Sequence, residues 1–490
     1  MTENIIVIGS GFSSLASATS LAAEGKKVTI LEKNSQTGGR ARQFSASGFT
    51  FDMGPSWYWM PDVFDAYFER FGKKVSDYYE LVRLDPSYQV IFQDKEFVDI
   101  PAAYTELKAL FEKYEKGSGA ELDKFLSEGE YKYRVGMDDL VHKPSQSILE
   151  FAQWKVIAGV FKLQLFSSIS KHIRKHFTNP KLIELLEFPV LFLGAKPQET
   201  PALYSLMNFA DIKLGTWYPL GGMHKIVEGM TALAKEKGVE FVLDCEVKKL
   251  EVKNGKVSKA ITTKGDFKGT HFISGADYHH TDKHLLDAEF HNYSAEYWDK
   301  RKMAPSSLLF YLGLDKKVEK LRHHNLFFDE SFNQHAIEIY DDPKWPSNPL
   351  FYVCVPSITD GTVAPDGKEN VFILIPVAPD LKDDEATREK YYHMVMDRLE
   401  SLTNQNIREH VIYKKSYAHS DFKADYHAFK GNAYGLANTL KQTAILKPNL
   451  RNKKLKNLFY TGQLTTPGPG VPPSLISGQV VAKEVLKTLA

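Results

Sequence analysis

The residues best suited to chemistry stand in the first forty positions, where glycines and one acid follow two apolar runs. Gly9 and Gly11 come directly after the run 5–8, and Glu32 ends the run 27–32. Glycines at a strand-to-helix turn let the backbone approach a pyrophosphate, and the helix that follows directs its free N–H groups at that anion. An acid about 20 residues further on can bind a ribose 2′-hydroxyl. Together with the turn 38–40, this order predicts a βαβ unit that binds FAD.

Ser14 stands where this fingerprint usually has its third glycine, which serves close packing of the helix on the strand. Because a serine side chain is small, we expect it to be tolerated. The alternative for this stretch is a secretion signal or a membrane span, since residues 4–23 lack charge. Glu3 precedes the run without any Lys or Arg, and the run is rich in Ser and Gly, which disfavours both alternatives.

The composition is that of an ordinary globular protein, with 490 residues, 43% hydrophobic and 25% charged. This length suggests about three domains. A net charge of +1 gives no overall attraction to nucleic acid, so we expect no nucleic-acid partner. The two cysteines, Cys245 and Cys354, are far apart and outside any CxxC, which indicates neither a disulfide framework nor a thiolate metal site. A reducing cytoplasm fits this usage best.

Two later stretches complete the pattern begun at the amino terminus. Apolar residues at helical spacing predict a helix that ends at Gly238, followed by a strand at 239–243 and a β-meander over 246–277 with a hairpin at Asn254-Gly255. Near the carboxyl terminus, strand 457–462 leads through a Pro-Gly loop to a helix that follows Pro472 and Pro473. The amino end of that helix suits the N1–C2=O edge of a flavin, which becomes negative on reduction.

The three segments lie far apart in the chain yet describe one cofactor site. We therefore expect a discontinuous FAD-binding domain formed by residues 1–75, 215–280 and 441–490. The intervening stretches, 76–214 and 281–440, would build the substrate-binding domain.

With the motifs 38–40, 51–56, 218–222 and 467–472 in this order, the chain resembles the phytoene desaturase-type carotenoid desaturases over its whole length. The resemblance implies an α/β fold: a Rossmann-like FAD-binding domain of the glutathione reductase type, an inserted α+β substrate domain and a helical membrane-facing part. Besides Ser14, the chain departs from the family at Thr466, where many members have a histidine. Gln463 follows Gly462 where the wider fold often has Asp, which argues against the amine oxidase branch.

The resemblance also implies which residues bind FAD. Those expected at the pyrophosphate, the ribose and the phosphate side of the flavin are Gly9, Ser10, Gly11, Phe12, Ser13, Glu32, Lys33, Gly39 and Arg40. Those expected at the isoalloxazine and the adenine are Gly54, Pro55, Ser56, Val247, Ala276, Asp277, Gly462, Gly470, Val471 and Pro472. Alone, each glycine is an ordinary turn, Arg40 a solvated surface residue and Glu32 a strand-end cap; jointly they favour a cofactor site.

Desaturation removes a hydride and a proton from adjacent carbons of a polyene, and a flavin accepts the hydride, so few polar catalytic residues are needed. A tunnel for a long apolar substrate should have aromatic walls. Its candidates are Trp57, Trp59, Trp217 and Tyr218, for which core packing is an equal alternative. No carboxylate is singled out as the base by its spacing, so the catalytic residues stay unassigned.

The histidines give no metal prediction. His172 and His176 have the i, i+4 spacing of metal ligands, but Lys171, Arg174 and Lys175 surround them without a nearby acid, so we expect no metal site. The adjacent pairs 279–280 and 323–324 do not share a helix face, and we expect them on the surface or in loops.

The stretch 151–183 contains no Asp or Glu and mixes large apolar residues such as Trp154, Ile157, Phe161 and Ile173 with basic ones. This composition predicts an interfacial helix drawn to anionic lipid, the alternative being a helical cap over the substrate cavity with a solvated basic face. A lipid-dissolved substrate would then be taken from the bilayer by a cytoplasmic protein on the inner face of the cell membrane.

The resemblance implies an FAD-dependent carotenoid desaturase with oxygen or a quinone as electron acceptor. Within the family the ending 467–478 is similar to that of bacterial desaturases acting late in the pathway, which implies 3,4-desaturation of a hydroxylated acyclic or monocyclic carotenoid. A phytoene desaturase or a carotenoid isomerase would share every motif. From other classes, a non-catalytic isoprenoid carrier with a flavin fold and an amine or porphyrinogen oxidase stay open.

Overall fold

The computed structural model describes residues 3–147, 150, 164, 167–439 and 441–489. Its amino-terminal unit consists of β1 (Asn4–Ile8), α1 (Phe12–Ala23) and β2 (Lys27–Leu31). The two strands pair in parallel from Asn4↔Lys27 to Ile8↔Leu31. The side chains of α1 are mostly small, and the helix is buried along almost its whole length. The predicted βαβ unit is therefore confirmed.

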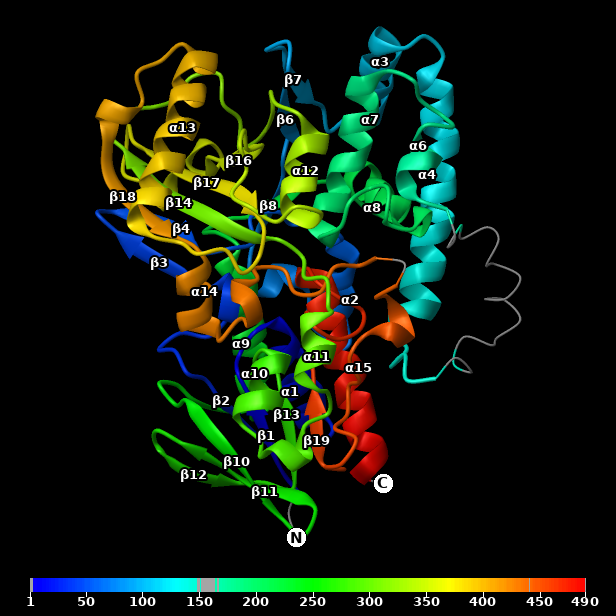
Figure 1. Ribbon diagram of the computed structural model, residues 1–490, viewed down its shortest axis with the longest axis vertical. Helices are drawn as coiled ribbons and strands as arrows, with labels where there is room; N and C mark the ends of the chain where they lie inside the picture. Colours follow the sequence, from blue (N-terminus) through cyan, green and yellow to red (C-terminus); the bar gives the residue numbers. More distant parts are fainter. Residues whose placement is uncertain (1–2, 148–149, 151–163, 165–166, 440, 490) are drawn as a thin grey trace.

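A five-stranded parallel sheet carries this unit, in the order β19-β13-β1-β2-β9. The added strands are β9 (Glu240–Val242), β13 (His271–Ser274) and β19 (Leu458–Tyr460). In Figure 1 the sheet lies in the lower half of the molecule, near both chain termini. Because all strands run the same way, their carboxyl ends meet at one edge, which is where ligands bind in open α/β sheets.

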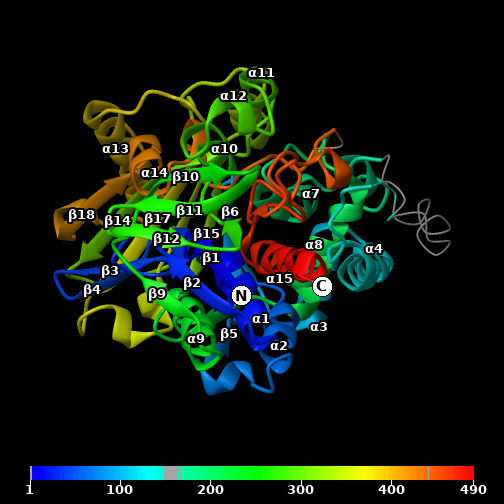
Figure 2. The same cartoon turned by 90° about the horizontal axis from the view of Figure 1, so that it is seen from below.

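The terminal helix α15 (Val471–Leu489) packs against α1, as Figure 2 shows from below. The two helices approach closely because residue 478 is glycine: a Cβ there would lie 2.1 Å from the carbonyl oxygen of Ser13. Pro472 and Pro473 lie in the first turn of α15, not ahead of it as expected. The N–H groups of the first helical turn have no acceptor within the helix, so prolines, which lack an N–H, are tolerated there.

A three-stranded meander follows α9 (His224–Glu236) and β9: β10 (Val247–Lys253), β11 (Lys256–Thr262) and β12 (Gly265–Lys268). Asn254 and Gly255 both have positive φ at the predicted hairpin. The prediction of one last strand through 277 was wrong, because the chain leaves the meander at Gly269 and enters the parallel sheet as β13. A Cβ at Gly269 would lie 2.8 Å from Ile6 Cγ1, so glycine lets the chain cross against β1.

A seven-stranded sheet occupies the upper half of the molecule in Figure 1, in the order β18-β14-β17-β16-β15-β6-β7. Its strands are β6 (Tyr88–Phe92), β7 (Phe97–Ile100), β14 (Ser306–Leu314), β15 (His324–Phe328), β16 (Phe351–Cys354), β17 (Glu369–Val377) and β18 (Val411–Tyr417). Alternate residues of β14 face different cores. Leu308 and Phe310 pack with α13 (Glu385–Thr403), whereas Leu309 and Tyr311 belong to the core shared with the parallel sheet.

Further elements surround the two sheets. Beside the seven-stranded sheet stand α3 (Tyr104–Tyr114), α4 (Ser118–Val135), α6 (Ile169–Ile173), α7 (Pro180–Glu187), α8 (Leu206–Phe209) and α12 (Phe332–Tyr340). The remaining short elements are α2 (Pro61–Glu69), α10 (Tyr278–His284), α11 (Ala295–Asp299), α14 (His419–Tyr426), and the strand pairs β3 (Gln43–Ala46) with β4 (Phe49–Asp52) and β5 (Leu81–Arg83) with β8 (Trp217–Pro219).

Most of the expected interfacial helix, including Trp154, Ile157 and Phe161, lies outside the described residues. In the described part, α6 has only five residues, and Ile173 is completely buried in the core. Arg174 forms an ion pair with Glu187. The prediction of a lipid-facing Ile173 was therefore wrong. Among the helices that the structure describes, none is long and apolar enough to cross a membrane.

Candidate functional site

One cavity of about 410 Å³ extends from the carboxyl edge of the parallel sheet to the seven-stranded sheet. Every residue predicted to bind FAD lines it, although these residues come from segments as far apart as Gly9 and Pro472. The structure thus brings the whole set together; the part of FAD that each residue contacts stays a prediction.

Glu32 ties the end of β2 to the glycine turn. Its carboxylate accepts hydrogen bonds from the Ser10 N–H at 2.8 Å and the Ser10 hydroxyl at 2.6 Å. Its other oxygen accepts from the Asn34 N–H at 2.8 Å. Gly11, the residue before α1, provides no side-chain cap, so the first N–H groups of this helix are free for an anion. Glu32 is therefore a buried acid that fastens the glycine turn to the end of β2.

Arg40 is a half-buried residue of the cavity wall, which does not fit the alternative of a solvated surface arginine. Its guanidinium lies 5.0 Å above the ring of Tyr426 and donates to the carbonyl oxygen of Asn432 at 3.3 Å. Burial lowers the pKa of Arg40, and the nearby carboxylate of Asp277 counteracts that shift. A cation held this way suits phosphate binding.

The motifs 51–56 and 218–222 meet at the start of α9. The Asp52 carboxylate accepts from the N–H groups of Met223 at 2.7 Å and His224 at 3.1 Å, and burial raises its pKa to about 6. Gly54 passes close to the backbone of Arg40, since a Cβ at residue 54 would lie 2.6 Å from the Arg40 carbonyl oxygen. The motif 218–222 and the start of α9 therefore hold the loop 54–56 in place, and this loop lines the cavity.

The amino end of α15 forms the opposite wall. Gly470 has φ +107° just before the helix, and the Gly462 N–H donates to the Ser477 hydroxyl at 3.1 Å. Thr466, which stands in place of the family histidine, donates to the Pro144 carbonyl oxygen at 3.4 Å and does not line the cavity among the described residues. The helix therefore presents its positive end to the site without an imidazole from this loop.

Two histidines that the sequence analysis did not assign to the site, His280 and His427, line the cavity near the parallel sheet. Their rings stack at 3.9 Å. His427 Nε2 lies 3.0 Å from Glu246 and 3.3 Å from Lys33 Nζ. The pair 279–280 was expected on the surface or in a loop, but both residues lie in α10, are half-buried, and stack on residues far along the chain, His279 on Phe429 at 4.0 Å.

The apolar part of the cavity contains two of the four predicted substrate residues. Trp57 and Trp59 line it, whereas Trp217 and Tyr218 do not. The indole of Trp217 donates to the Leu214 carbonyl oxygen, and Tyr218 is buried beside Asp360. The missed residues are mainly on the seven-stranded sheet: Leu309, Leu326, Phe328, Leu350, Tyr352 and Leu374. The sequence carries no signal for them in β14, because this strand is a continuous apolar run buried at every position and does not reveal which face meets the cavity.

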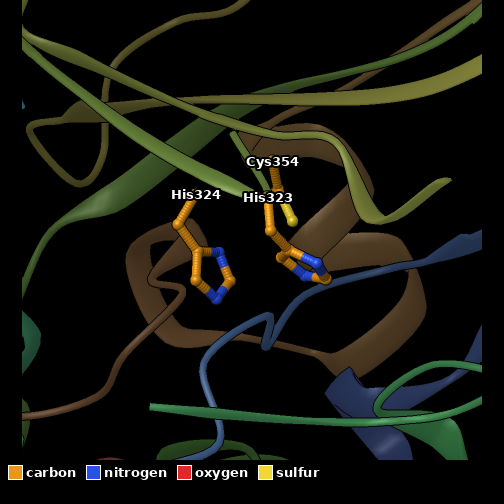
Figure 3. A group of neighbouring side chains, drawn as sticks. All are labelled: His323, His324 and Cys354. Atoms are coloured by element: carbon orange, nitrogen blue, oxygen red, sulfur yellow. The ribbon is translucent and has the colours of Figure 1, made fainter. Parts of the chain in front are cut away.

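The pair His323 and His324 is buried, contrary to the expectation of surface or loop residues. Figure 3 shows their imidazoles side by side with the Cys354 thiol next to them, and ligand-type atoms of the three lie within 4.8 Å of one another. Hydroxyl groups lie against both Nδ1 atoms, that of Thr359 at 2.7 Å from His323 and that of Tyr352 at 2.6 Å from His324. Burial raises the pKa of the Cys354 thiol to about 12. Cys245 and Cys354 are both free.

The second histidine group contains acids, so the expectation that none lies nearby was wrong. His176 Nδ1 lies 3.0 Å from Glu121, and His172 Nε2 lies 3.5 Å from Glu128. The Lys132 ammonium nevertheless occupies the space 3.4 Å from His172 Nε2. A cation in that position competes with a metal ion for the same acceptors.

Comparisons with known proteins agree with this architecture. The flavin containing amine oxidoreductase family matches residues 12–486. The carotenoid 3,4-desaturase of Haloarcula japonica is 40% identical over 100% of this chain and 99% of its own, and the zeta-carotene-forming phytoene desaturase of Myxococcus xanthus is 29% identical over 99% and 94%. The crystal structure of an oxidoreductase from Methanosarcina mazei superposes with a TM-score of 0.62 at 17% identity, covering 98% and 100% of the two chains.

The mixed α/β fold and the cavity at the glycine turn define a flavin-dependent oxidoreductase, and its cofactor is FAD. The chain belongs to the flavin containing amine oxidoreductase family.

Proposed function

We propose that this chain is a carotenoid desaturase that removes hydrogen across the 3,4 bond of a hydroxylated acyclic or monocyclic carotenoid. The observation that carries the proposal is the continuity of one cavity from the glycine turn to an apolar wall on β14–β17. Such a wall fits a long apolar chain better than an amine or a tetrapyrrole with charged groups. The full-length similarity to a protein named carotenoid 3,4-desaturase supports the bond chosen.

FAD supplies the hydride acceptor when bound. Glu32 would hold the ribose, the free N–H groups of α1 the pyrophosphate, and the amino end of α15 the flavin edge that gains negative charge. Trp57 and Trp59 would orient the polyene, and the aliphatic residues of β14–β17 would exclude water from it. Electrons would leave to oxygen or a quinone.

We also propose the division into an FAD-binding domain (1–75, 215–280 and 441–490) and a substrate domain (76–214 and 281–440). Every strand of the five-stranded sheet comes from the first set, and every strand of the seven-stranded sheet comes from the second. The cavity is lined by residues of both sets.

Peripheral binding to the inner face of the cell membrane is proposed as the route by which the substrate arrives. Lys171 on α6 and Lys175 just after it are exposed, and at a separate place on the surface the apolar residues Ile445 and Leu446 are 39% and 48% exposed. Exposed basic residues and exposed apolar residues are both features of surfaces that contact anionic lipid.

Co-sedimentation with liposomes tests this proposal. The charge reversals Lys171→Glu and Lys175→Glu together should weaken binding to anionic vesicles, and the weakening should disappear in vesicles of neutral lipid. Lys253→Glu with Lys256→Glu, in the β10–β11 hairpin, is the matched control and should bind like the wild type. Equal binding of all three proteins to anionic vesicles would contradict a basic docking surface.

Product analysis tests the activity. Purified holoenzyme in liposomes is given a hydroxylated carotenoid, phytoene and a polar amine under anaerobic conditions. A 3,4-desaturase bleaches the flavin absorbance with the hydroxylated carotenoid and yields a product lighter by two hydrogens. Reaction with phytoene indicates the earlier desaturation, a product of unchanged mass indicates an isomerase, and bound carotenoid with oxidised flavin indicates a carrier. Turnover of the amine would refute the proposal.

A further inference from the structure

The apolar part of the cavity contains few groups that can exchange a proton. The carboxylates and imidazoles of the cavity wall all lie at the dinucleotide side: Glu32, Glu246, Asp277, His280, Asp425 and His427. Among the described residues of the wall near the seven-stranded sheet, the ionisable ones are the tyrosines Tyr352 and Tyr434. A base for the desaturation must therefore be sought at a phenol.

Tyr352 differs from Tyr434 because a histidine stands behind its hydroxyl group. Tyr352 Oη lies 2.6 Å from His324 Nδ1, and it also contacts the side chains of Ser56 and Cys354. Ser56 belongs to the loop that follows Gly54 along the same cavity wall. The hydroxyl of Tyr352 thus connects a residue of the cavity to a buried imidazole.

His324 is held rigidly and kept neutral. It is completely buried, stacks on Trp57 at 4.1 Å with an interplanar angle of 11°, and lies opposite Cys354 in the β15–β16 pairing. Its Nε2 has no hydrogen-bond partner among the described residues. Burial lowers the pKa of His324 well below its usual range, so the ring enters the reaction in its neutral form.

We infer that Tyr352 is the catalytic residue that accepts the proton leaving the polyene, and that His324 is a positioning residue that takes up the phenolic proton at Nδ1. The inference rests on the proposed desaturase function. One carbon loses a hydride, with both electrons of its C–H bond, to the oxidised flavin. The neighbouring carbon loses a proton to Tyr352 Oη, while the phenolic proton moves to His324 Nδ1. The electron pair left on the carbons forms the new double bond.

A neutral phenol is a sufficient acceptor here. Loss of a hydride leaves an allylic cation, in which the adjacent C–H bond is strongly acidic, so the base need not be a carboxylate. A carboxylate would be charged, and costly in this apolar environment, throughout the catalytic cycle, whereas the imidazole becomes charged only when the strongly acidic C–H bond gives up its proton. The wall can therefore remain apolar and still remove a proton, with the imidazole hidden behind the tyrosine.

The same cluster could instead hold a transition metal, because His323, His324 and Cys354 supply typical ligand atoms. The hydroxyl groups of Tyr352 and Thr359 against the two Nδ1 atoms favour hydrogen bonding at those nitrogens. Metal analysis of the purified holoenzyme is therefore part of the test.

Kinetics of Tyr352→Phe, His324→Asn and the double variant test the relay. Asn places an oxygen near the position of Nδ1 but cannot take up the proton. Each single variant should lower kcat by about 100-fold or more, with little change in KM, and the double variant should be no slower than Tyr352→Phe. Tyr392→Phe, which removes a buried phenol on α13, is the matched control and should keep the wild-type kcat.

Histidine-labelled holoenzyme gives a readout independent of turnover. In ¹⁵N spectra, the signals lost in His324→Asn should show an unprotonated Nδ1 and a protonated Nε2. A protonated Nδ1, a stoichiometric bound metal, or wild-type kcat in FAD-loaded Tyr352→Phe would each overturn the inference. If Tyr352→Phe does not load FAD, His324→Asn and the spectra still decide. If the wild-type protein desaturates no carotenoid, the proposed function fails, which is a separate result.

Discussion

The hydroxyl of Ser14 occupies the space that a side chain at residue 275 would need. A Cβ on Gly275 would lie 2.0 Å from Ser14 Oγ. Ser14 is completely buried on α1, and Gly275 follows β13 in the neighbouring position of the parallel sheet. In the usual fingerprint, a glycine at the position of Ser14 allows the helix to pack closely on the strand. Here the residue without a side chain is Gly275, on the strand side of the contact, so the serine is accommodated as expected.

Exchanging the two residues should show this dependence. Gly275→Ala should destabilise the protein by about 1–3 kcal/mol because it overpacks the contact. Ser14→Gly should be nearly neutral alone and should recover much of that loss in the double variant, since it vacates the space. Urea unfolding of the four proteins measures the coupling. Additive effects of the two substitutions would show that the residues do not share one space.

The contact between α1 and α15 predicts a second effect. Gly478→Ala would place its Cβ 2.1 Å from the Ser13 carbonyl oxygen, so α15 must shift away from α1. Because the amino end of α15 also lines the cavity, the shift should weaken FAD binding together with stability. Thermal unfolding and FAD content measure the two losses. Ala482→Gly, a substitution on the same helix, is the control that should lower stability without a clash.

Removal of the negative charge at Glu32 should weaken the binding of FAD. Glu32→Gln keeps the shape of the side chain but turns one acceptor oxygen into a donor facing the Ser10 or Asn34 N–H groups. A charge-assisted hydrogen bond contributes about 1.5–3 kcal/mol, so the dissociation constant of FAD should rise by about 10- to 100-fold. Titration of the apoprotein with FAD checks this. Glu236→Gln, an exposed acid on α9, should leave the constant unchanged.

The sequence predicted many residues of the cavity wall near the parallel sheet, because the signals there are local. Gly9, Gly39 and Gly470 each have positive φ, which is a property of a few consecutive residues, and all three line the cavity. The hairpin at Asn254-Gly255 is a signal of the same kind. Such turns fix where the backbone bends and where a phosphate can approach.

The remaining features depend on contacts between distant segments. Whether the strand after Gly269 stays in the meander or joins β1 depends on the free edge of the parallel sheet, which no window of sequence contains. The burial of His324 likewise depends on Trp57 and Tyr352, from two other segments. Trp217 and Tyr218 have the right residue type for a tunnel, but the fold directs them elsewhere. Residue type alone therefore could not distinguish side chains that line the substrate cavity from side chains that pack in the core.

Lys447 is a buried cation behind the Pro-Gly loop of the C-terminal segment. The residue is 4% exposed, and its Nζ has no hydrogen-bond partner among the described residues. A Cβ at Gly468 would lie 3.3 Å from this nitrogen, so the lysine reaches the loop directly. Burial lowers the pKa of Lys447 to about 7.

The pH dependence of stability should reveal this lysine. Between pH 7 and about 10.5 the unfolded chain holds a proton on Lys447 that the folded chain does not, so stability should rise with pH across this window. Lys447→Met should therefore stabilise the protein at pH 7, by on the order of 4 kcal/mol, and the gain should shrink toward pH 10. Urea unfolding of the holoenzyme at pH 7 and pH 10 measures both. Lys487→Met, an exposed lysine of α15, should show no such trend, and a Lys447→Met gain that is equal at both pH values would mean that the lysine is charged in the folded protein.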